Sequence, residues 1–269
     1  MENGSLIGKR IVITRTREQS HMLVARLREA GAEPIVCPAI AIIPPESYEI
    51  LDAAIGNLAS YQWLIFASAN AVRAFAARFD LAGMRTSDLG RLRIAAVGSA
   101  TAQELSVRLR APDCTPDQYD GDAILTTIGN VRAQRILIPS ADIAREALAM
   151  GLRERGAVVD VVVAYRTVAG PGILELAETV RSRRADAVVF ASPSGVRYAL
   201  QALNQVGVTP EYLIADTGRP AFFCIGGVTA SAARQLGIPV DVTAAEHSTA
   251  GLVAAITDWF VSRDENVAT

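Results

Sequence analysis

The feature that most constrains the fold of this chain is an internal duplication. Four sequence blocks return in the same order at an offset of about 125 residues, a period far too long for a solenoid repeat. The pairs are "RIVI" (10–13) with "RILI" (135–138), "LREAGA" (27–32) with "LRERGA" (152–157), "FASANAVR" (66–73) with "FASPSGVR" (190–197), and, more loosely, "AVGSATA" (96–102) with "CIGGVTA" (224–230). The sequence therefore predicts two copies of one domain.

Each copy alternates short apolar runs with amphipathic segments. The run "RIVIT" has strand length and many β-branched residues, and it precedes a helical pattern over 18–30 that Gly31 can end. Further strands are expected at "PIVCPAIAII" (34–43), "WLIFA" (63–67) and "RIAAV" (93–97), and further helices over 69–79 and 100–109. Apolar strands joined through helices indicate a parallel sheet that is covered on both faces. We expect an α/β fold of two similar doubly wound domains.

Two stretches are candidates for the crossings between the copies. One lies near Pro38, Pro44 and Pro45, and the other is "AYRTVAGPG" (164–172), where glycine and proline interrupt the chain. Neither stretch is long or of low complexity, so both are expected to be structured crossings rather than flexible tethers. The tail after Phe260 is expected to be frayed.

Charge, cysteine spacing and the length of the apolar runs indicate the cellular compartment and exclude some classes of partner. A chain of 269 residues with net charge −2 and no run of basic residues does not suit nucleic acid. Its three cysteines show no CxxC spacing, which is typical of a reducing compartment. The N-terminus does not look like a secretory signal, and the apolar runs fall short of the ~20 residues of a membrane span. We expect a cytoplasmic protein without nucleic-acid or membrane partners.

Small hydroxyl residues follow the predicted strands, where loops lead into helix N-termini. In parallel sheets ligands bind beyond the carboxyl ends of the strands, and helix N-termini attract anions there. A single Ser or Thr at such a place is more often a helix cap, which stabilises the helix by ~1 kcal/mol. We call each junction between a strand end and the following helix N-terminus a corner. Repetition of hydroxyl residues at equivalent corners of two domains nevertheless favours a site for a ligand with many carboxylates. The candidates are Thr14, Arg15, Thr16, Arg17, Ser68, Arg73, Ser99, Thr101, Ser192, Ser194, Arg197 and Thr229.

Other chemistry finds little support. The two histidines, His21 and His247, lack neighbours at metal-ligand spacing, and no complete GxGxxG, GxxxxGK[ST] or GxSxG motif is present. No metal or cofactor is expected. Tyr165 lies at the second crossing, where a tyrosine usually caps a core. A phenol that faces a cleft could instead donate a proton to a leaving group.

Taken together, these motifs resemble the uroporphyrinogen-III synthase family over nearly the whole chain. The resemblance rests on "GKRIVITRTREQS", "LREAGAEPIVCPAIAI", "WLIFASANAV", "AAVGSATA", "AREALAMGLRERGAVVDVVVAYRTV", "VVFASPSGV" and "CIGGVTASAARQLG", in this order and at these spacings. It implies two domains joined by a two-stranded β-ladder. Domain 1 would hold residues 1–38 and 170–269, domain 2 residues 43–163, and residues 39–42 and 164–169 would be the linker strands.

The resemblance also implies the reaction. The family's substrate is hydroxymethylbilane, a linear tetrapyrrole with eight carboxylate arms, which the enzyme closes to uroporphyrinogen III. Loss of the hydroxyl as water leaves an azafulvene-like cation. The substituted carbon of ring D then attacks to form a spiro intermediate, which opens and recloses with ring D inverted. The pyrrole nitrogen supplies the electrons, so the protein mainly has to fold the substrate correctly. A monomeric lyase of porphyrin and heme biosynthesis without a cofactor is implied.

The family's functional residues carry over to matching positions. Tyr165 corresponds to the tyrosine that assists departure of the hydroxyl, and Arg15 to a basic position after the first strand. The cleft hydroxyls correspond to Ser68, Thr101, Ser192 and Thr229, with Ser99 and Ser194 beside them. Ala67 and Ala191 stand where many relatives carry threonine, so two hydroxyl contacts are missing here.

Two other functions remain possible from the sequence. Two α/β lobes around a hinge also describe a non-catalytic binding or sensor module for a polycarboxylate tetrapyrrole, although these 269 residues show no regulatory extension. An unrelated lyase or isomerase that handles carboxylates is the third alternative, because a fold does not fix a function.

Overall fold

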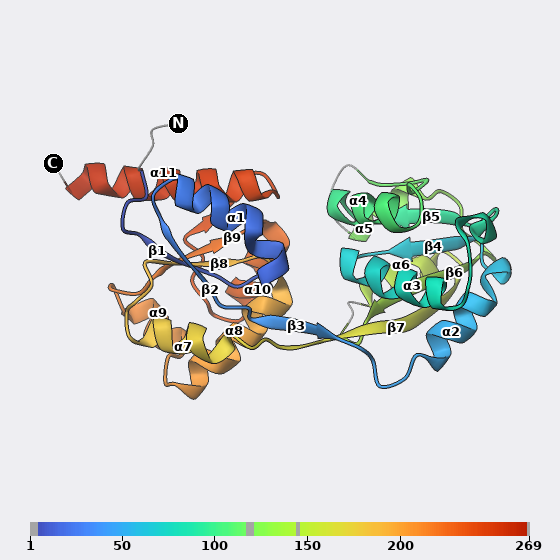
Figure 1. Cartoon of the computed structure of the whole chain (residues 1–269), viewed down its shortest axis with the longest axis horizontal. Coiled ribbons are helices and arrows are strands. Elements are labelled where there is room, and N and C mark those ends of the chain that lie inside the picture. Colours follow the sequence, from blue (N-terminus) through green and yellow to red (C-terminus); the bar gives the residue numbers. More distant parts are fainter. Residues whose placement is uncertain (1–4, 117–120, 144–145, 268–269) are drawn as a thin grey trace. The chain divides into compact units, whose positions relative to one another are not determined.

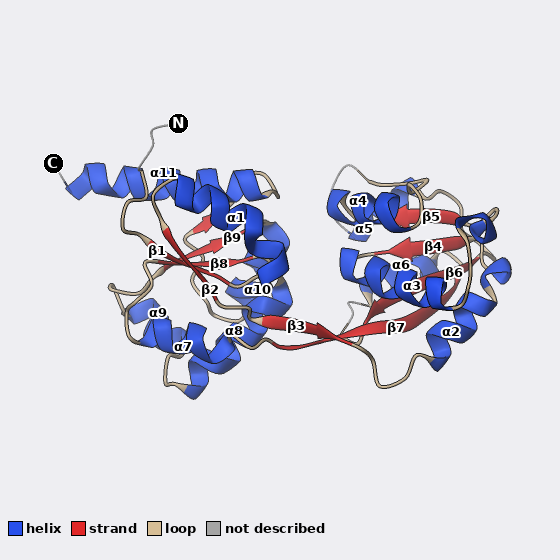
Figure 2. Ribbon diagram, viewed as in Figure 1, coloured by secondary structure: helices blue, strands red, loops and turns tan. Residues whose placement is uncertain are grey.

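The computed structural model describes residues 5–116, 121–143 and 146–267. The chain divides into two compact units, which we call unit 1 (Met1–Ala41 with Val168–Thr269) and unit 2 (Ile42–Thr167). Each unit contains a sheet of five strands with helices on both faces (Figures 1 and 2).

Unit 1 is built on a parallel sheet in the order β10-β9-β8-β1-β2. Its strands are β1 (Arg10–Ile13), β2 (Glu33–Val36), β8 (Ala187–Phe190), β9 (Ala221–Cys224) and β10 (Val242–Thr243). Its helices are α1 (Arg17–Glu29), α7 (Ile173–Arg181), α8 (Pro193–Gln205), α9 (Pro210–Ala215), α10 (Gly227–Gln235) and α11 (Thr249–Val267). The central strands β8 and β9 are buried along their whole length, as expected for strands covered on both faces.

The two faces of this sheet carry separate hydrophobic clusters. Val188 and Phe222 point to one face, where they pack with residues of α7, α8 and α10. Val189 and Phe223 point to the other face, where α1 and α11 cover them (Figure 1). The prediction of a frayed tail after Phe260 is wrong for residues 261–267, which continue helix α11, and its last two residues lie outside the described ranges.

Unit 2 is built on a sheet in the order β3-β7-β6-β4-β5. Its strands are β3 (Ile40–Ile43), β4 (Trp63–Phe66), β5 (Arg93–Ala96), β6 (Arg135–Ala141) and β7 (Val158–Ala169). Its helices are α2 (Glu49–Gly56), α3 (Ala69–Leu81), α4 (Ser99–Arg108), α5 (Gly121–Thr127) and α6 (Ala147–Glu154), with short 3₁₀ turns at Leu58–Ser60 and Thr86–Leu89. One cluster packs α2, α3 and α4 on one face, and a second packs α5 and α6 on the other.

The duplication is visible in the order of the strands. The sequence repeat matches β1 with β6, β2 with the start of β7, β8 with β4, and β9 with β5. The order β9-β8-β1-β2 in unit 1 is therefore the same as the order β5-β4-β6-β7 in unit 2. The first βαβ segment of the chain lies in unit 1, together with strands of the second sequence copy. The predicted fold class, two similar doubly wound parallel domains, is confirmed.

The predicted strand over 34–43 is divided in the structure. It forms β2 in the sheet of unit 1 and β3 in the sheet of unit 2, with Cys37–Ala39 between them. Cys37 and Ala39, on either side of Pro38, still donate to the carbonyl oxygens of Ile13 and Thr14 at 3.0 Å, and the chain then passes to the second sheet. Strand β3 pairs antiparallel with β7, so these two strands form the link (Figure 2).

Candidate active site

In unit 2 the predicted catalytic tyrosine lies at the N-terminus of a helix. Tyr165 of β7 is 8% exposed, and its hydroxyl lies 3.0 Å from the Oγ atom of Ser68. Ser68 follows β4 as the N-cap of α3, and its oxygen accepts the N–H of Ala71 at 3.1 Å. The phenol therefore lies beside the positive end of a helix dipole.

Burial raises the pKa of the Tyr165 phenol above its ordinary value. The hydrogen bond between Tyr165 and Ser68 acts in the opposite direction, and the negative charge of Asp142 adds to the rise. The ordinary pKa of a tyrosine is already about 10, so the phenol is protonated at neutral pH. Tyr165 can therefore act as a proton donor.

The neighbouring corner of unit 2, between β5 and α4, has an open helix N-terminus. Gly98 occupies the N-cap position at φ 104°, and no side chain accepts a hydrogen bond there. Ser99 is exposed at the first helical position, and Thr101 is 4% exposed at the third. Within the ranges that the structure describes, the Thr101 hydroxyl has no hydrogen-bond partner. Free N–H groups and an unpaired hydroxyl suit an anion.

Unit 1 repeats this open corner between β9 and α10. Gly226 is the N-cap, again without a capping side chain, and Thr229 is 3% exposed at the third helical position. The Thr229 hydroxyl likewise has no hydrogen-bond partner among the residues described. The imidazole of His247 lies against Gly226, since a Cβ atom built on this glycine would come within 2.5 Å of the His247 Cδ2 atom. A side chain at position 226 would therefore require the His247 ring to move.

The corner after β1 presents a half-buried cation. Thr14 donates to the Val189 carbonyl at 2.7 Å, and Thr16 caps α1, so both hydroxyls already serve the fold. Arg15 has no ion-pair partner in the described part of the chain. Desolvation lowers the pKa of Arg15, and the pKa of His247 is lowered mainly by desolvation and further by the Arg15 charge. An arginine stays charged at neutral pH in spite of this shift.

The other predicted residues are placed at the same strand ends. Ser192 follows β8 and caps α8 by accepting the N–H of Gly195 at 3.1 Å, and Ser194 is half-buried in the first turn of α8. Arg73 of α3 is held by an ion pair with Glu104 at 2.7 Å, so its charge is already used within unit 2. Arg17 and Arg197 are exposed on α1 and α8.

The structure thus brings the predicted residues together in sets. Tyr165 and Ser68 are in direct contact, and Ser99 and Thr101 follow β5, the strand next to β4. In unit 1, Arg15, Ser192, Ser194 and Thr229 follow the three adjacent strands β1, β8 and β9. The sequence predicts no role for His247 at this edge, because the residue lacks neighbours at metal-ligand spacing, and the two-residue strand β10 before it gives no periodic signal.

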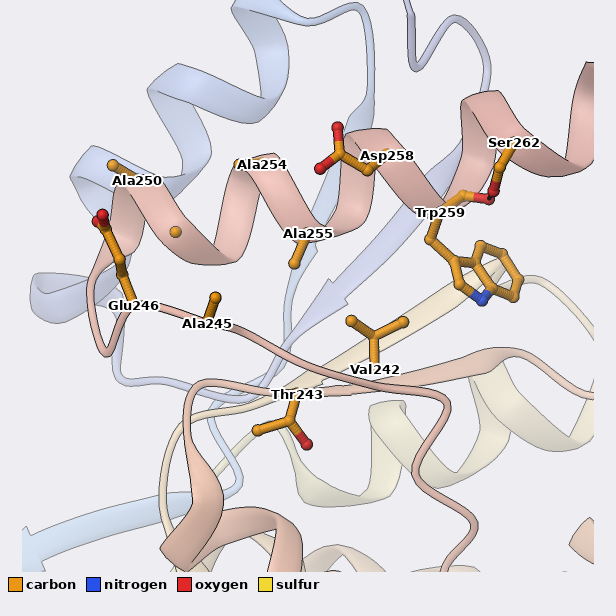
Figure 3. A pocket seen from close by; sticks show the side chains of 11 residues that line it. Val242, Thr243, Ala245, Glu246, Ala250, Ala254, Ala255, Asp258, Trp259 and Ser262 are labelled. Carbon is orange, nitrogen blue, oxygen red and sulfur yellow. Dashed lines mark hydrogen bonds between the residues drawn. The ribbon is translucent and has the colours of Figure 1, made fainter.

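A pocket of about 760 Å³ lies elsewhere in unit 1, between β10 and α11 (Figure 3). Its lining is mainly apolar, with Ala250, Ala254 and Trp259 on α11 and Val242 on β10, and it includes the carboxylates of Glu246 and Asp258. None of the residues proposed for the active site lines this pocket. It is therefore separate from the candidate active site.

Neither a cluster of metal ligands nor a membrane-spanning helix is found among the described residues. No group of three or more His, Cys, Asp or Glu side chains there could hold a metal ion. No helix in the described ranges has both the length and the apolar character to cross a membrane.

Comparisons with known proteins agree with one another. The family described as uroporphyrinogen-III synthase HemD matches residues 21–254. A uroporphyrinogen-III synthase from Synechococcus elongatus is 34% identical over 263 residues, which cover 96% of this chain and 98% of that protein. A chloroplastic uroporphyrinogen-III synthase from Oryza sativa is 26% identical over 85% of this chain and 73% of its own length.

Solved structures share the fold. A mutant uroporphyrinogen III synthase from Thermus thermophilus superposes with a TM-score of 0.71 at 19% identity, over 95% of this chain and all of that one. The synthetase from Helicobacter pylori gives a TM-score of 0.58 at 16% identity, over 93% of this chain and 99% of its own. By the extent of the family match and the identity to the Synechococcus protein, the chain belongs to the uroporphyrinogen-III synthase family, whose reaction converts hydroxymethylbilane to uroporphyrinogen III.

Proposed function

We propose that this uroporphyrinogen-III synthase uses Tyr165 as the proton donor to the departing hydroxyl of hydroxymethylbilane. The observation that carries this proposal is the 3.0 Å contact between the Tyr165 hydroxyl and Ser68 at the start of α3, together with the raised pKa of the phenol. A protonated phenol at a helix N-terminus can donate a proton while negative groups of the substrate are held nearby.

The proposed reaction needs one proton transfer from the protein. The bond between the hydroxymethyl carbon and its oxygen breaks, the oxygen takes the Tyr165 proton, and water leaves. The electron pair of the pyrrole nitrogen forms the azafulvene-like cation, which the substituted carbon of ring D attacks. The spiro intermediate opens and recloses with ring D inverted, and loss of a proton from the ring restores the pyrrole and can return Tyr165 to its neutral form. The protein otherwise acts by holding the substrate in a reactive conformation.

We propose that the carboxylate arms are held at two kinds of corner. At the open corners, backbone N–H groups that follow Gly98 and Gly226 are available, and Thr101 and Thr229 add one side-chain hydroxyl to each. At the capped corners, Ser68 and Ser192 already accept one backbone N–H and retain a hydroxyl proton to donate. Arg15, Ser99 and Ser194 complete the proposed set, with Arg15 supplying the positive charge.

We further propose that the family's domain division applies to this chain, with residues 1–38 and 170–269 in one domain, 43–163 in the other, and 39–42 and 164–169 as linker strands. A monomer in the cytoplasm is proposed as its working state. The free thiols of Cys37 and Cys224, both buried, support a reducing compartment. Light scattering of the purified chain should give about the mass of one 28.5 kDa protomer, and a mass of twice that value would contradict the monomer.

The test of the proposed role is a Tyr165→Phe variant. Loss of the phenolic proton donor should lower kcat by at least about tenfold while KM changes little, because the substrate arms are held by other residues. Tyr48→Phe is the matched control, since its ring lies over the Arg78 guanidinium at 4.5 Å and belongs to no candidate corner. Unchanged turnover in Tyr165→Phe would remove the tyrosine from the mechanism.

A further inference from the structure

Strand β7 carries an extra residue immediately before Tyr165. Along the parallel pair of β6 and β7, Ser140 is opposite Val163, but the next residue, Ala141, is opposite Tyr165. Ala164 is therefore left without a partner in the register, which is the definition of a β-bulge. A bulge of this kind changes the direction in which the following side chains point.

The bulge decides which face of the sheet receives Tyr165. Side chains alternate between faces along a strand, so Val161 and Val163 would share their face with Tyr165 if β7 were regular. That face is open at these positions, where Val161 is 42% and Val163 is 41% exposed. With the bulge, Tyr165 instead joins Val162 and Ala164 in the cluster that includes α3. The helix that Ser68 caps is on this face, so the bulge is required for the contact between Tyr165 and Ser68.

Asp142 holds the backbone of β7 at two points just after the bulge. Its backbone N–H donates to the carbonyl oxygen of Tyr165 at 3.1 Å, and its Oδ1 atom accepts the N–H of Thr167 at 3.1 Å. Its Oδ2 atom lies 3.6 Å from the Arg166 Nε atom. Asp142 lies just after Ala141, the last residue of β6. Its carboxylate therefore accepts a hydrogen bond from β7 at a point where β6 has already ended.

The other sequence copy has no continuous strand at the corresponding position. At the offset of the repeat, about 125 residues, Ala39 corresponds to Ala164 and Pro38 corresponds to Val163. In that copy the strand ends before Pro38, and the chain resumes as β3 in another sheet. The second copy instead keeps one strand of 12 residues through the same position. The continuous strand with its bulge thus belongs to the copy that carries the tyrosine.

We propose that Asp142 is a positioning residue that holds the bulge at Ala164 and thereby aims the Tyr165 hydroxyl at the N-terminus of α3. This inference rests on the proposed role of Tyr165. It assigns the work of Asp142 to the position of its Oδ1 acceptor rather than to its charge.

Two substitutions of Asp142 separate the effect of the acceptor's position from the effect of the charge. Asp142→Glu keeps the charge but moves the acceptor by one methylene, and it should lower kcat by about tenfold with little change in KM. Asp142→Asn loses the charge but can keep an amide oxygen opposite the Thr167 N–H, and its kcat should stay within about threefold of the original. Asp160→Asn is the control on β7, the strand of Tyr165, since the Asp160 carboxylate binds Tyr61 and Arg135. This substitution should lower the free energy of unfolding without affecting kcat.

The decisive measurement repeats Asp142→Glu in the Tyr165→Phe background. Because Asp142 acts through the phenol, the second substitution should lower kcat no further once the phenolic hydroxyl is gone. An additive effect would overturn the inference, as would a slow Asp142→Asn beside a fully active Asp142→Glu. If Tyr165→Phe is slow while both Asp142 variants match the original chain, the positioning role alone is refuted. If Tyr165→Phe turns over normally, the proposed role of Tyr165 fails, and this inference fails with it.

Discussion

At the residue scale, single hydroxyl groups carry structural and proposed functional roles together. Ser68 caps α3, as its position in the sequence predicts, and it also contacts the Tyr165 hydroxyl. The capping role is local and can be read from the sequence pattern. The contact joins residues 97 positions apart and depends on a bulge, so no local pattern could predict it.

Thr101 and Thr229 give the sharpest residue-scale prediction, because they occupy the same helical position in the two units. Thr→Val at either site removes a hydroxyl that has no hydrogen-bond partner among the described residues, so the free energy of unfolding should change little. Each substitution should nevertheless raise KM by about fivefold, which corresponds to loss of about one hydrogen bond of ~1 kcal/mol to the substrate.

Thr179→Val is the control for these two variants. Thr179 is 3% exposed on α7, in a helix that belongs to none of the candidate corners. Its substitution should leave KM unchanged. An unchanged KM in Thr101→Val and Thr229→Val as well would remove these hydroxyls from substrate binding.

At the scale of the elements, the strands at 63–67 and 93–97 and the helices over 18–30, 69–79 and 100–109 match the structure closely, because apolar runs and helical periodicity are local properties. The error at 34–43 has a clear cause. The run "PIVCPAIAII" is continuously apolar, since β2 and β3 are both partly buried, but the two strands belong to different sheets. Hydrophobicity reports burial and does not report which sheet provides it.

Gly170 lies so close to the backbone of residues 38–40 that one added methyl group should destabilise the fold. A Cβ atom on Gly170 would lie 2.1 Å from the Pro38 carbonyl oxygen and 2.6 Å from the Ile40 nitrogen, both of which are backbone atoms. Gly170→Ala should therefore lower the free energy of unfolding by about 2–3 kcal/mol, as measured by urea denaturation.

Gly56→Ala is the control for this prediction. Gly56 ends α2, and nothing lies within 4 Å of a Cβ atom at this position. Alanine there should be neutral or should stabilise the chain by up to about 1 kcal/mol, because it favours the helix. Equal stability of the two variants would show that the backbones at the link are not packed this closely.

At the scale of the whole molecule, the sequence repeat and the compact units do not coincide. The first βαβ segment pairs with strands of the other copy, and its counterpart, β6-α6-β7, does the same in unit 2. The duplication could be read from the sequence, and the resemblance to the family implied the exchange. Residue patterns alone could not reveal it, since the matched strands are short and mostly apolar in both copies, and such a pattern does not specify which sheet a strand completes.

Buried thiol and phenol groups in the two units predict a loss of folding stability at alkaline pH. Burial raises the pKa of the Cys37 and Cys224 thiols to about 12, and desolvation, with a hydrogen bond to Asp160, raises the pKa of Tyr61 to about 12. In the unfolded chain these groups ionise near about 8.5 and 10. Because the folded pKa values are the higher ones, this stability is complete below about pH 8.5 and is lost as the pH rises towards 12.

Urea denaturation at a series of pH values measures this loss. The free energy of unfolding should fall progressively above about pH 9, and the fall should be less steep in a Cys37→Ala/Cys224→Ala variant. A free energy of unfolding that is constant from pH 9 to pH 11 would contradict the burial of these groups.

The isomer of the cyclised product tests the central claim most directly. Freshly prepared hydroxymethylbilane is incubated with and without the protein, and the products are oxidised and separated into type I and type III porphyrins. Without an enzyme the linear tetrapyrrole closes to type I, because ring D is not inverted. We expect type III only in the sample with the protein, and type I alone in both samples would show that the chain does not catalyse the reaction of its family.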